Sequence, residues 1–312
     1  MPPDSTEQNG NECWVGYSID DLLAGAAADK FASEESSEAV KYFAQRVRNN
    51  KGIYPAEKQA ASRKILKPFQ SGDVLYFPGC VTKAHFPATV AGMVTIAEKA
   101  GARLMTDSDQ QVCCGAPSVF AGDLDTAREL VQRNYEYIQN SGAEIVVCDC
   151  PECTRVLRQA YPRLDFALSQ PVLHASEWIW SLLESGAISF ASPPLDQEDT
   201  PSVAYYAPCI LAKSLGVIQP PRRILQELYP NIVFQESRDG NEFSPCGFCG
   251  LADVVSPGSG AKTARTFLDY FASAGAKNIV TACPTCQLGF QKSDPDGEFN
   301  VKNIIEVVAS AL

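Results

Sequence analysis

The sequence predicts an α/β fold in which two similar cysteine-rich subdomains, each built on a parallel sheet, follow a helical N-terminal extension. Two observations predict this fold: a cysteine pattern that recurs, and a recurring order of apolar strands and amphipathic helices. The cysteine pattern repeats at offsets of 129, 132, 133 and 133 residues, which join Cys80 to Cys209, Cys114 to Cys246, Cys150 to Cys283 and Cys153 to Cys286. A nearly constant offset at four positions indicates an internal duplication.

Bulk composition is that of a globular chain that neither binds nucleic acid nor spans a membrane. The 312 residues carry a formal charge of −11, whereas nucleic acid and anionic membrane surfaces attract basic patches. No apolar run approaches the ~20 residues that a membrane-spanning helix needs. The N-terminus from Met1 to Glu7 is polar and lacks the apolar core of a signal peptide, so we expect a cytoplasmic protein.

The helical extension is predicted over residues 1–72. Residues 1–12 have the composition of a flexible tail, and residues 18–48 have helical periodicity. The segment from Asn49 to Pro55 interrupts that helix, and a second helix is predicted over residues 56–65. We expect this extension to dock a partner chain.

The first repeat is predicted over residues 73–190. Its strands are expected at residues 74–77, between Gly101 and Cys113, at 144–148 and from residue 172. Its helices are expected at residues 88–100, 123–140, 154–160 and after residue 177. Residues 185–201 contain Pro193-Pro194 and several acidic residues, a composition typical of a linker between domains.

The second repeat, over residues 202–312, retraces this order. Strands are predicted at residues 203–206, 232–235 and 278–282, and helices at 221–228 and 261–274. Alternating strands and helices favour a mainly parallel, Rossmann-like sheet in each half. The correspondence of His174 to Asn303 favours a capping or hydrogen-bonding role for His174 over proton transfer.

Each cysteine group follows a predicted strand or precedes a predicted helix. Because the carboxyl ends of parallel strands meet at one edge of a sheet, segments as far apart as Cys114 and Cys150, with 35 residues between them, can converge there. Nearby helix N-termini would stabilise thiolate charge. Twelve cysteines in a chain of this length without a signal peptide indicate metal or redox chemistry rather than disulfides.

An iron–sulfur cluster is the favoured cofactor, and structural zinc is the alternative. Adjacent Cys113 and Cys114 do not easily bind one tetrahedral ion together, but they can bind different irons of a cluster. Zinc sites usually pair two Cys-x-x-Cys hooks, whereas each half here has one. The zinc alternative predicts a metal-stabilised interaction scaffold without redox activity.

These residues resemble the CCG-domain family of cysteine-rich proteins, in which a single cysteine, a Cys-Cys-Gly group and a Cys-x-x-Cys turn follow one another. The type member is the B subunit of heterodisulfide reductase. The resemblance covers residues 73–312 and implies that a complete five-cysteine set holds a non-cubane [4Fe-4S] cluster. By this resemblance, the ligands in the first half are Cys80, Cys113, Cys114, Cys150 and Cys153.

The second half departs from the family pattern, because Pro245-Cys246-Gly247 stands where the family has Cys-Cys-Gly. Either Cys249 supplies a fifth bond to a second non-cubane cluster, or an ordinary cubane [4Fe-4S] cluster is held by Cys209, Cys246, Cys283 and Cys286. We favour the cubane, which gives two [4Fe-4S] clusters in total.

Three other residues are expected to lie outside these ligand sets. Cys148 aligns with Thr281 and is expected to be buried without binding metal, and Cys13 has no cysteine near it. His85 closely follows Cys80, and we expect it to be a loop residue rather than a group that touches cluster or substrate.

The resemblance implies an oxidoreductase subunit that acts in a complex. The favoured hypothesis is the iron–sulfur subunit of a heterodisulfide-reductase-like complex, which passes electrons between a ferredoxin-type or flavoprotein subunit and a disulfide substrate. The alternative is a non-catalytic electron-transfer subunit of a quinone-linked dehydrogenase of the succinate, fumarate, glycerol-3-phosphate or lactate type. The sequence has no ferredoxin-type cysteine run, so such clusters, and any membrane association, would come from partners.

Overall fold

A computed structural model describes residues 34–107, 109–191, 202–234 and 243–312. The predicted tail, Cys13, the first part of the predicted 18–48 helix and residues 192–201 of the predicted linker lie outside these described residues. Within them, the helical extension is confirmed, and it consists of α3 (Glu34–Asn50), η2 (Ala56–Gln59) and α4 (Ala60–Leu66).

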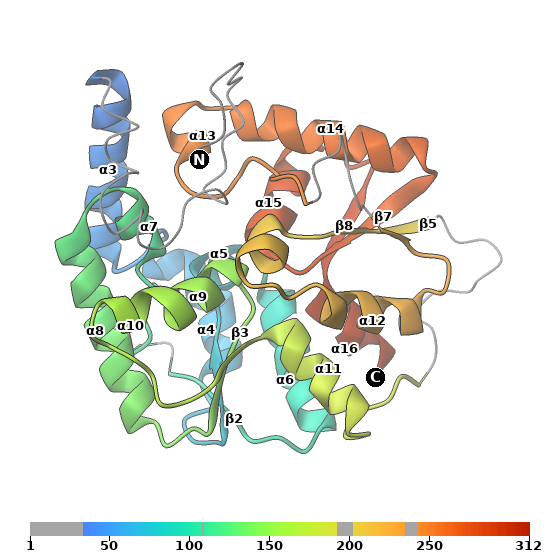
Figure 1. Ribbon diagram of the computed structural model, residues 1–312, viewed down its shortest axis with the longest axis horizontal. Coiled ribbons are helices and arrows are strands. Elements are labelled where there is room, and N and C mark those ends of the chain that lie inside the picture. Colours follow the sequence, from blue (N-terminus) through green and yellow to red (C-terminus); the bar gives the residue numbers. More distant parts are fainter. Residues whose placement is uncertain (1–33, 108, 192–201, 235–242) are drawn as a thin grey trace, which may run out of the picture.

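The first half is built on a four-stranded sheet in which every neighbouring pair is parallel (Figure 1). The strand order is β2-β1-β3-β4, with β1 (Val74–Phe77), β2 (Leu104–Met105), β3 (Ile145–Cys148) and β4 (Val172–His174). The helices of this half are α5 (Cys80–His85), α6 (Pro87–Lys99), α7 (Ala116–Phe120), α8 (Leu124–Asn140), α9 (Pro151–Arg155), η3 (Val156–Ala160), α10 (Tyr161–Arg163) and α11 (Ala175–Glu184).

The second half repeats this topology, which confirms the predicted duplication. Its sheet has the equivalent order β6-β5-β7-β8, again parallel throughout, with β5 (Ser202–Tyr206), β6 (Val233–Phe234), β7 (Ala276–Thr281) and β8 (Asn300–Asn303). The helices are η4 (Ile210–Ser214), α12 (Gln219–Leu228), α13 (Ala252–Val255), α14 (Ser259–Ser273), α15 (Pro284–Lys292) and α16 (Ile304–Ala311).

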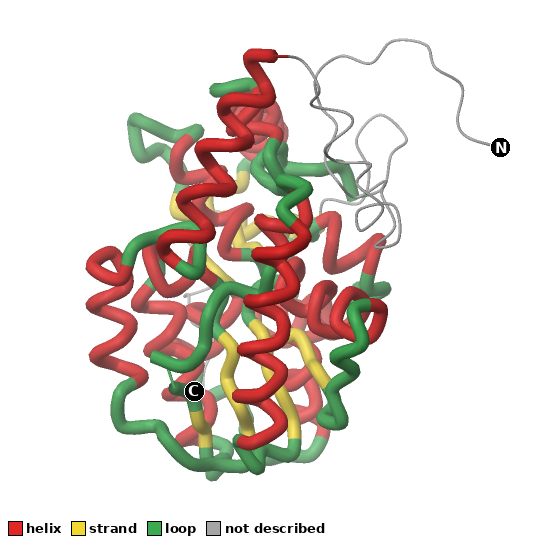
Figure 2. Tube along the Cα trace, turned by 90° about the vertical axis from the view of Figure 1, so that its left-hand side faces the viewer, coloured by secondary structure: helices red, strands yellow, loops and turns green. Residues whose placement is uncertain are grey.

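The central strands are apolar because helices cover both faces of each sheet. All four residues of β1 are buried, as expected for a parallel strand covered on both sides. Figure 2 shows the strands lying inside the molecule with helices around them. The register also repeats, since Phe77 pairs with Cys148 and Cys148 with His174, while Tyr206, Thr281 and Asn303 pair in the same way.

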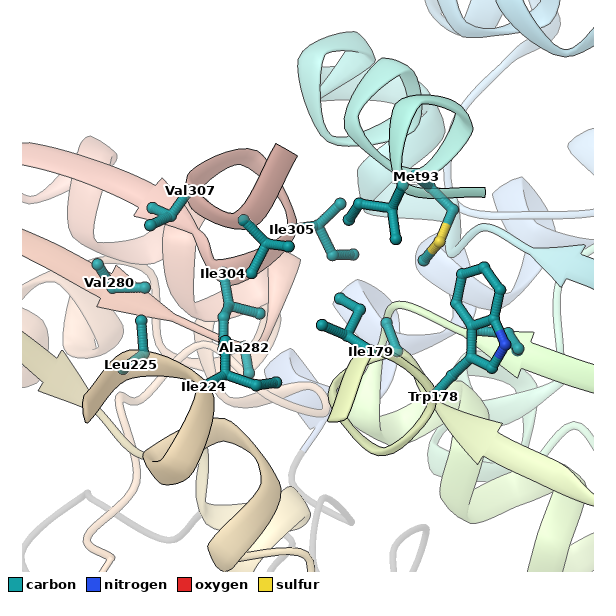
Figure 3. Close-up of a cluster of buried hydrophobic side chains, with 14 of the residues drawn as sticks. Met93, Trp178, Ile179, Ile224, Leu225, Val280, Ala282, Ile304, Ile305 and Val307 are labelled. Carbon is teal, nitrogen blue, oxygen red and sulfur yellow. The ribbon is translucent and has the colours of Figure 1, made fainter. Parts of the chain in front are cut away.

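An apolar interface joins the two halves. Helix α6 of the first half packs on α16 of the second, and the equivalent helices of the opposite halves, α12 and α11, also pack together. Because α6 corresponds to α12 and α16 corresponds to α11, the two contacts are equivalent, and the interface has approximate two-fold symmetry. Figure 3 shows the side chains that meet there, among them Met93, Trp178, Ile179, Ile224 and Ile305.

Corresponding polar residues cap the last helix of each half. His174 accepts a hydrogen bond from the backbone N–H of Ser176 at 3.2 Å, and the Glu177 carboxylate accepts one from the backbone N–H of His174 at 2.8 Å. Asn303 accepts the equivalent bond from the N–H of Ile305 at 3.1 Å. The predicted capping role of His174 is therefore confirmed.

The buried His174 ring makes stability depend on pH. Burial, and to a lesser extent Arg158, lower the pKa of His174 to about 3, so the folded ring stays neutral where the unfolded ring, with an ordinary pKa of 6.5, gains a proton. Stability is therefore lost as the pH falls below 6.5, by at most about 1.4 kcal/mol per pH unit from one group.

The variant His174→Asn, which copies the cap of the second half, is expected to flatten this dependence. Denaturant unfolding of both proteins between pH 5 and 7.5 measures it. Equal slopes for variant and wild type would contradict the prediction.

Candidate metal centre

Five thiols of the first half surround one cavity of about 220 Å³. Thiol contacts run in a chain around it, from Cys80 to Cys113, Cys114, Cys153 and Cys150. Four of these residues are buried, and Cys80 is partly exposed. The structure thus brings together the complete set of first-half residues that the sequence singled out.

Strand ends and helix starts place these thiols. Cys80 begins α5 directly after β1, Cys150 is the N-cap of α9, and Cys153 lies in the first turn of α9. Gly115 follows the adjacent cysteine pair with a φ of 99°, a conformation that favours glycine, and α7 starts from it. Convergence at the carboxyl edge of the sheet, as expected from parallel topology, therefore accounts for the site.

A buried carboxylate ties two of the cysteine-bearing turns together. Asp149 lies between Cys148 and Cys150 and accepts hydrogen bonds from the Tyr76 hydroxyl at 2.6 Å and the Gly79 N–H at 2.9 Å. Burial raises the pKa of Asp149, and these bonds oppose that shift. Sequence reasoning missed this residue, and an acidic residue at the end of an apolar strand was the available signal.

Gly79 explains how closely the same two turns approach. A Cβ atom at Gly79 would lie 3.1 Å from the Cβ of Cys150, so the first cysteine-bearing turn needs glycine at this point.

The N-terminal extension forms one wall of the site. The Lys51 carbonyl accepts a hydrogen bond from the Cys113 N–H at 3.0 Å, and a Cβ atom at Gly52 would lie 3.4 Å from the sulfur of Cys80. The backbone N–H of Ile53 favours the thiolate of Cys80. Sequence reasoning gave this segment only a docking role, because nothing local shows that residues before β1 reach the cysteines.

The thiols interact too strongly to ionise together without a cation. Hydrogen bonds from Cys113 and Cys153 lower the pKa of Cys114 to about 7, whereas the hydrogen bond with Cys114 raises the pKa of Cys113. Contact with Cys113 and burial raise the pKa of Cys80. Ionisation of one thiol therefore disfavours ionisation of its neighbours. Bound metal cations would offset this repulsion between thiolates.

The second half gathers a similar set of thiols. The sulfur atoms of Cys246 and Cys286 lie 3.3 Å apart, and Cys283 contacts Cys286. Gly247 has a φ of 89°, close to that of Gly115. Cys209 is buried at the start of η4, as Cys80 starts α5.

Cys249 forms a hydrogen bond with Cys246, as Cys113 does with Cys114, but it raises the pKa of Cys246 whereas Cys113 lowers the pKa of Cys114. It also lines the 220 Å³ cavity of the first half, together with Phe248 and Leu288. The second half therefore closes the first site. The hydrogen bond with Cys153 lowers the pKa of Cys150, whereas burial and the neighbouring Cys283 raise it, so the two cysteine sets are adjacent.

The donor set fits a cluster. Among the described residues, no three Cys, His, Asp or Glu side chains are placed to hold a single metal ion. Five soft sulfur donors from three chain segments surround a common cavity instead, and thiolates are the ligands by which proteins hold iron–sulfur clusters.

Comparison with known proteins agrees with this arrangement. A family model for the cysteine-rich domain matches residues 74–158 and matches again at residues 203–291. The chain belongs to the cysteine-rich domain family. Each copy of the cysteine-rich domain lies within one of the duplicated halves, and the resemblance noted from the motifs is confirmed.

Three relatives are named as subunits of reductases or as an iron–sulfur protein. The chain is 26% identical over 297 residues to the D subunit of dihydromethanophenazine:CoB–CoM heterodisulfide reductase of Methanosarcina barkeri, covering 84% of this chain and 70% of that one. It is 26% identical to the B subunit of the CoM/CoB fumarate reductase of Methanothermobacter marburgensis, covering 76% of this chain and 46% of that one. An uncharacterised iron–sulfur protein of Methanocaldococcus jannaschii is 24% identical, covering 83% and 49%.

The chain therefore spans less than half the length of two of these relatives. Their names support a redox role and iron–sulfur clusters for this cysteine-rich protein at a general level, and place two of the relatives in multi-subunit complexes. In the part of the chain that the structure describes, every helix is too short or too polar to cross a membrane.

Two further residues of the first cysteine-rich domain are placed by the structure. Cys148 is fully buried within β3, in line with the expected core position. The prediction that His85 lies in a loop is wrong, because it is the last residue of α5. Its ring packs edge-on against Tyr54 with 4.8 Å between centroids.

Proposed function

We propose that this chain is the iron–sulfur subunit of a heterodisulfide-reductase-like complex, active with its partners. In this role it passes electrons between a ferredoxin-type or flavoprotein subunit and a disulfide substrate. The observation that supports the proposal most is the cavity of about 220 Å³, which five thiols of one half surround and the other half closes.

The proposed ligands of the first, non-cubane [4Fe-4S] cluster are Cys80, Cys113, Cys114, Cys150 and Cys153. The proposed ligands of a cubane cluster in the second half are Cys209, Cys246, Cys283 and Cys286, with Cys249 as a possible fifth donor if that cluster is also non-cubane. When bound, the clusters would supply one-electron storage beside the substrate and iron atoms with affinity for sulfur.

The chain's own residues would orient the substrate and exclude water. Phe43, Phe120 and Phe248 line the cavity with apolar surface, which favours an organic sulfur compound over water. Charged side chains that contribute to the lining are Glu152, Asp253 and Lys292, and these would select the polar ends of a substrate. The adjacency of Cys150 and Cys283 would keep electron transfer between the two sites short.

The second candidate is a non-catalytic electron-transfer subunit of a quinone-linked dehydrogenase. The replacement of the first cysteine of the second pair by Pro245 favours it, since it makes the two halves chemically unequal. In that case the cavity would hold no substrate, and electrons would only pass through the chain.

Blocking the cavity separates these two functions. Leu288 lies on α15 and lines the cavity, so Leu288→Trp is expected to fill much of it while leaving the cysteines in place. Wild-type protein, reconstituted anaerobically and given reduced viologen and an organic disulfide, should release thiol. The variant should lose at least about tenfold in thiol release, yet its clusters should still be reduced. If the clusters of the wild type are reduced but no thiol is released, the non-catalytic electron-transfer subunit is favoured.

A further inference from the structure

A second cavity, of about 180 Å³, reaches the same metal site from a different direction. It touches Cys80 and Cys113, as the first cavity does, but most of its lining is polar. The charged and amide side chains in this lining are Lys51, Gln59, Arg63, Lys83, Asp109, Gln111 and Arg133, with Asn50 at one side. Cationic residues outnumber acidic ones here, which makes the surroundings of these two cysteines electropositive.

Lys83 differs from the other cationic residues of this polar cavity. Lys51 pairs with Glu129, Arg63 with Asp109 at 2.9 Å, and Arg133 donates to the Asp109 carbonyl at 3.1 Å. Lys83 lies one turn after Cys80 on α5 and is only 4% exposed. Over the described ranges, its ammonium has no hydrogen bond and no ion pair.

A positive charge that lines a cavity is attracted to negative charge that develops in the same cavity, and this attraction is stronger there than in bulk water. Asp149 lies within the electrostatic reach of Lys83 on one side, where its oxygens also accept hydrogen bonds from the neutral Tyr76 hydroxyl and Gly79 N–H. On the other side, Lys83 lines the polar cavity together with Cys80 and Cys113. The positive charge of Lys83 therefore lies beside the five-cysteine site.

We propose that Lys83 is the fixed counter-charge of the first cluster and raises its reduction potential above that of the second. This inference rests on the proposed function, since it needs a cluster at the five cysteines. Reduction adds negative charge to a cluster already bound by thiolates, and a cation in the adjoining cavity stabilises the reduced form.

The duplication allows the charge at equivalent positions of the two halves to be compared. Cys209 follows Cys80 by 129 residues, and the residue that follows Lys83 by the same offset is Ala212. The second site therefore lacks the equivalent cation. Ala212 is buried in η4, in the place that Lys83 has in α5. Electrons would therefore collect at the first cluster, beside the cavity proposed to hold the substrate.

The test compares Lys83→Met with wild-type protein, both reconstituted anaerobically and titrated against a reductant while paramagnetic resonance follows each cluster. At a fixed ambient potential, the ratio of reduced to oxidised first cluster should fall by about tenfold in the variant, which equals 59 mV for a one-electron couple. Lys83→Arg keeps the charge and should stay within about twofold of wild type. The matched control is Lys213→Met, an exposed lysine in the equivalent helix η4 of the second half, which should change neither cluster.

The possible outcomes separate this inference from the proposed function. If Lys83→Met binds wild-type amounts of iron and gives the wild-type ratio, the counter-charge role is overturned while the proposed function stands. If the wild type itself binds no iron, the proposed function fails. Should Lys83→Met not fold, Lys83→Gln, which keeps a polar side chain of similar length, is titrated in its place and judged by the same ratio.

Discussion

Replacing Cys153 by alanine is expected to remove the first cluster and about half of the iron bound per chain. Cys153 contacts both Cys114 and Cys150, and it lies in the buried first turn of α9. Its loss breaks the chain of thiols between Cys114 and Cys150, so the cluster would lose a ligand for which water is a poor substitute in this buried position. Iron content and paramagnetic resonance of the reconstituted variant measure the effect, and only one of two cluster signals should disappear.

Cys148→Ala is the matched control for this experiment. Cys148 is five residues away and fully buried, but it lies within β3 and behaves as a small apolar side chain. We expect the control to keep about eight irons per chain, four for each cluster. Equal iron in Cys153→Ala and Cys148→Ala would show that the five thiols do not bind the metal.

Replacing Gly92 by leucine is expected to destabilise the interface between the halves by about 3 kcal/mol or more, the upper end of the usual cost of overpacking. Gly92 lies in α6 where it meets α16. A Cβ atom there would lie 3.2 Å from Cγ2 and from the backbone oxygen of Ile305, and 3.3 Å from the Cβ of Ala309. The longer leucine side chain has no room in this contact, so the helices must separate.

Urea unfolding of Gly92→Leu against wild type measures this loss. The control is Ala91→Leu, at an exposed position of the same helix, which should change the unfolding free energy by less than about 0.5 kcal/mol. Because the second half closes the cysteine cavity, Gly92→Leu should also reduce the retention of iron. Unchanged stability in Gly92→Leu would mean that the two halves do not pack through α6 and α16.

Features set by local pattern were predictable from the sequence. The nearly constant offset of the cysteines predicted the duplication, and the alternation of strands with helices predicted the parallel sheets. Both signals can be read from the spacing of residues along the chain. The convergence of Cys80, Cys114 and Cys150 followed from the same topology. The capping role of His174 was predictable because Asn303, its counterpart, is a common N-cap residue.

Features set by the packing of distant segments were not predictable. Asp149 became important through Tyr76 and Gly79, which lie about 70 residues earlier in the chain. The approach of Gly52 to Cys80 depends on how the extension lies against the first sheet. The position of Cys249 in the first cavity depends on how the halves face each other, which no spacing within one half reveals.

The most direct test of the central claim is the iron, zinc and acid-labile sulfide content of the wild-type chain after anaerobic reconstitution. Two clusters predict about eight irons and about eight sulfides per chain, with little zinc. One or two zinc ions per chain without sulfide, or a chain that retains neither iron nor sulfide, would contradict the account.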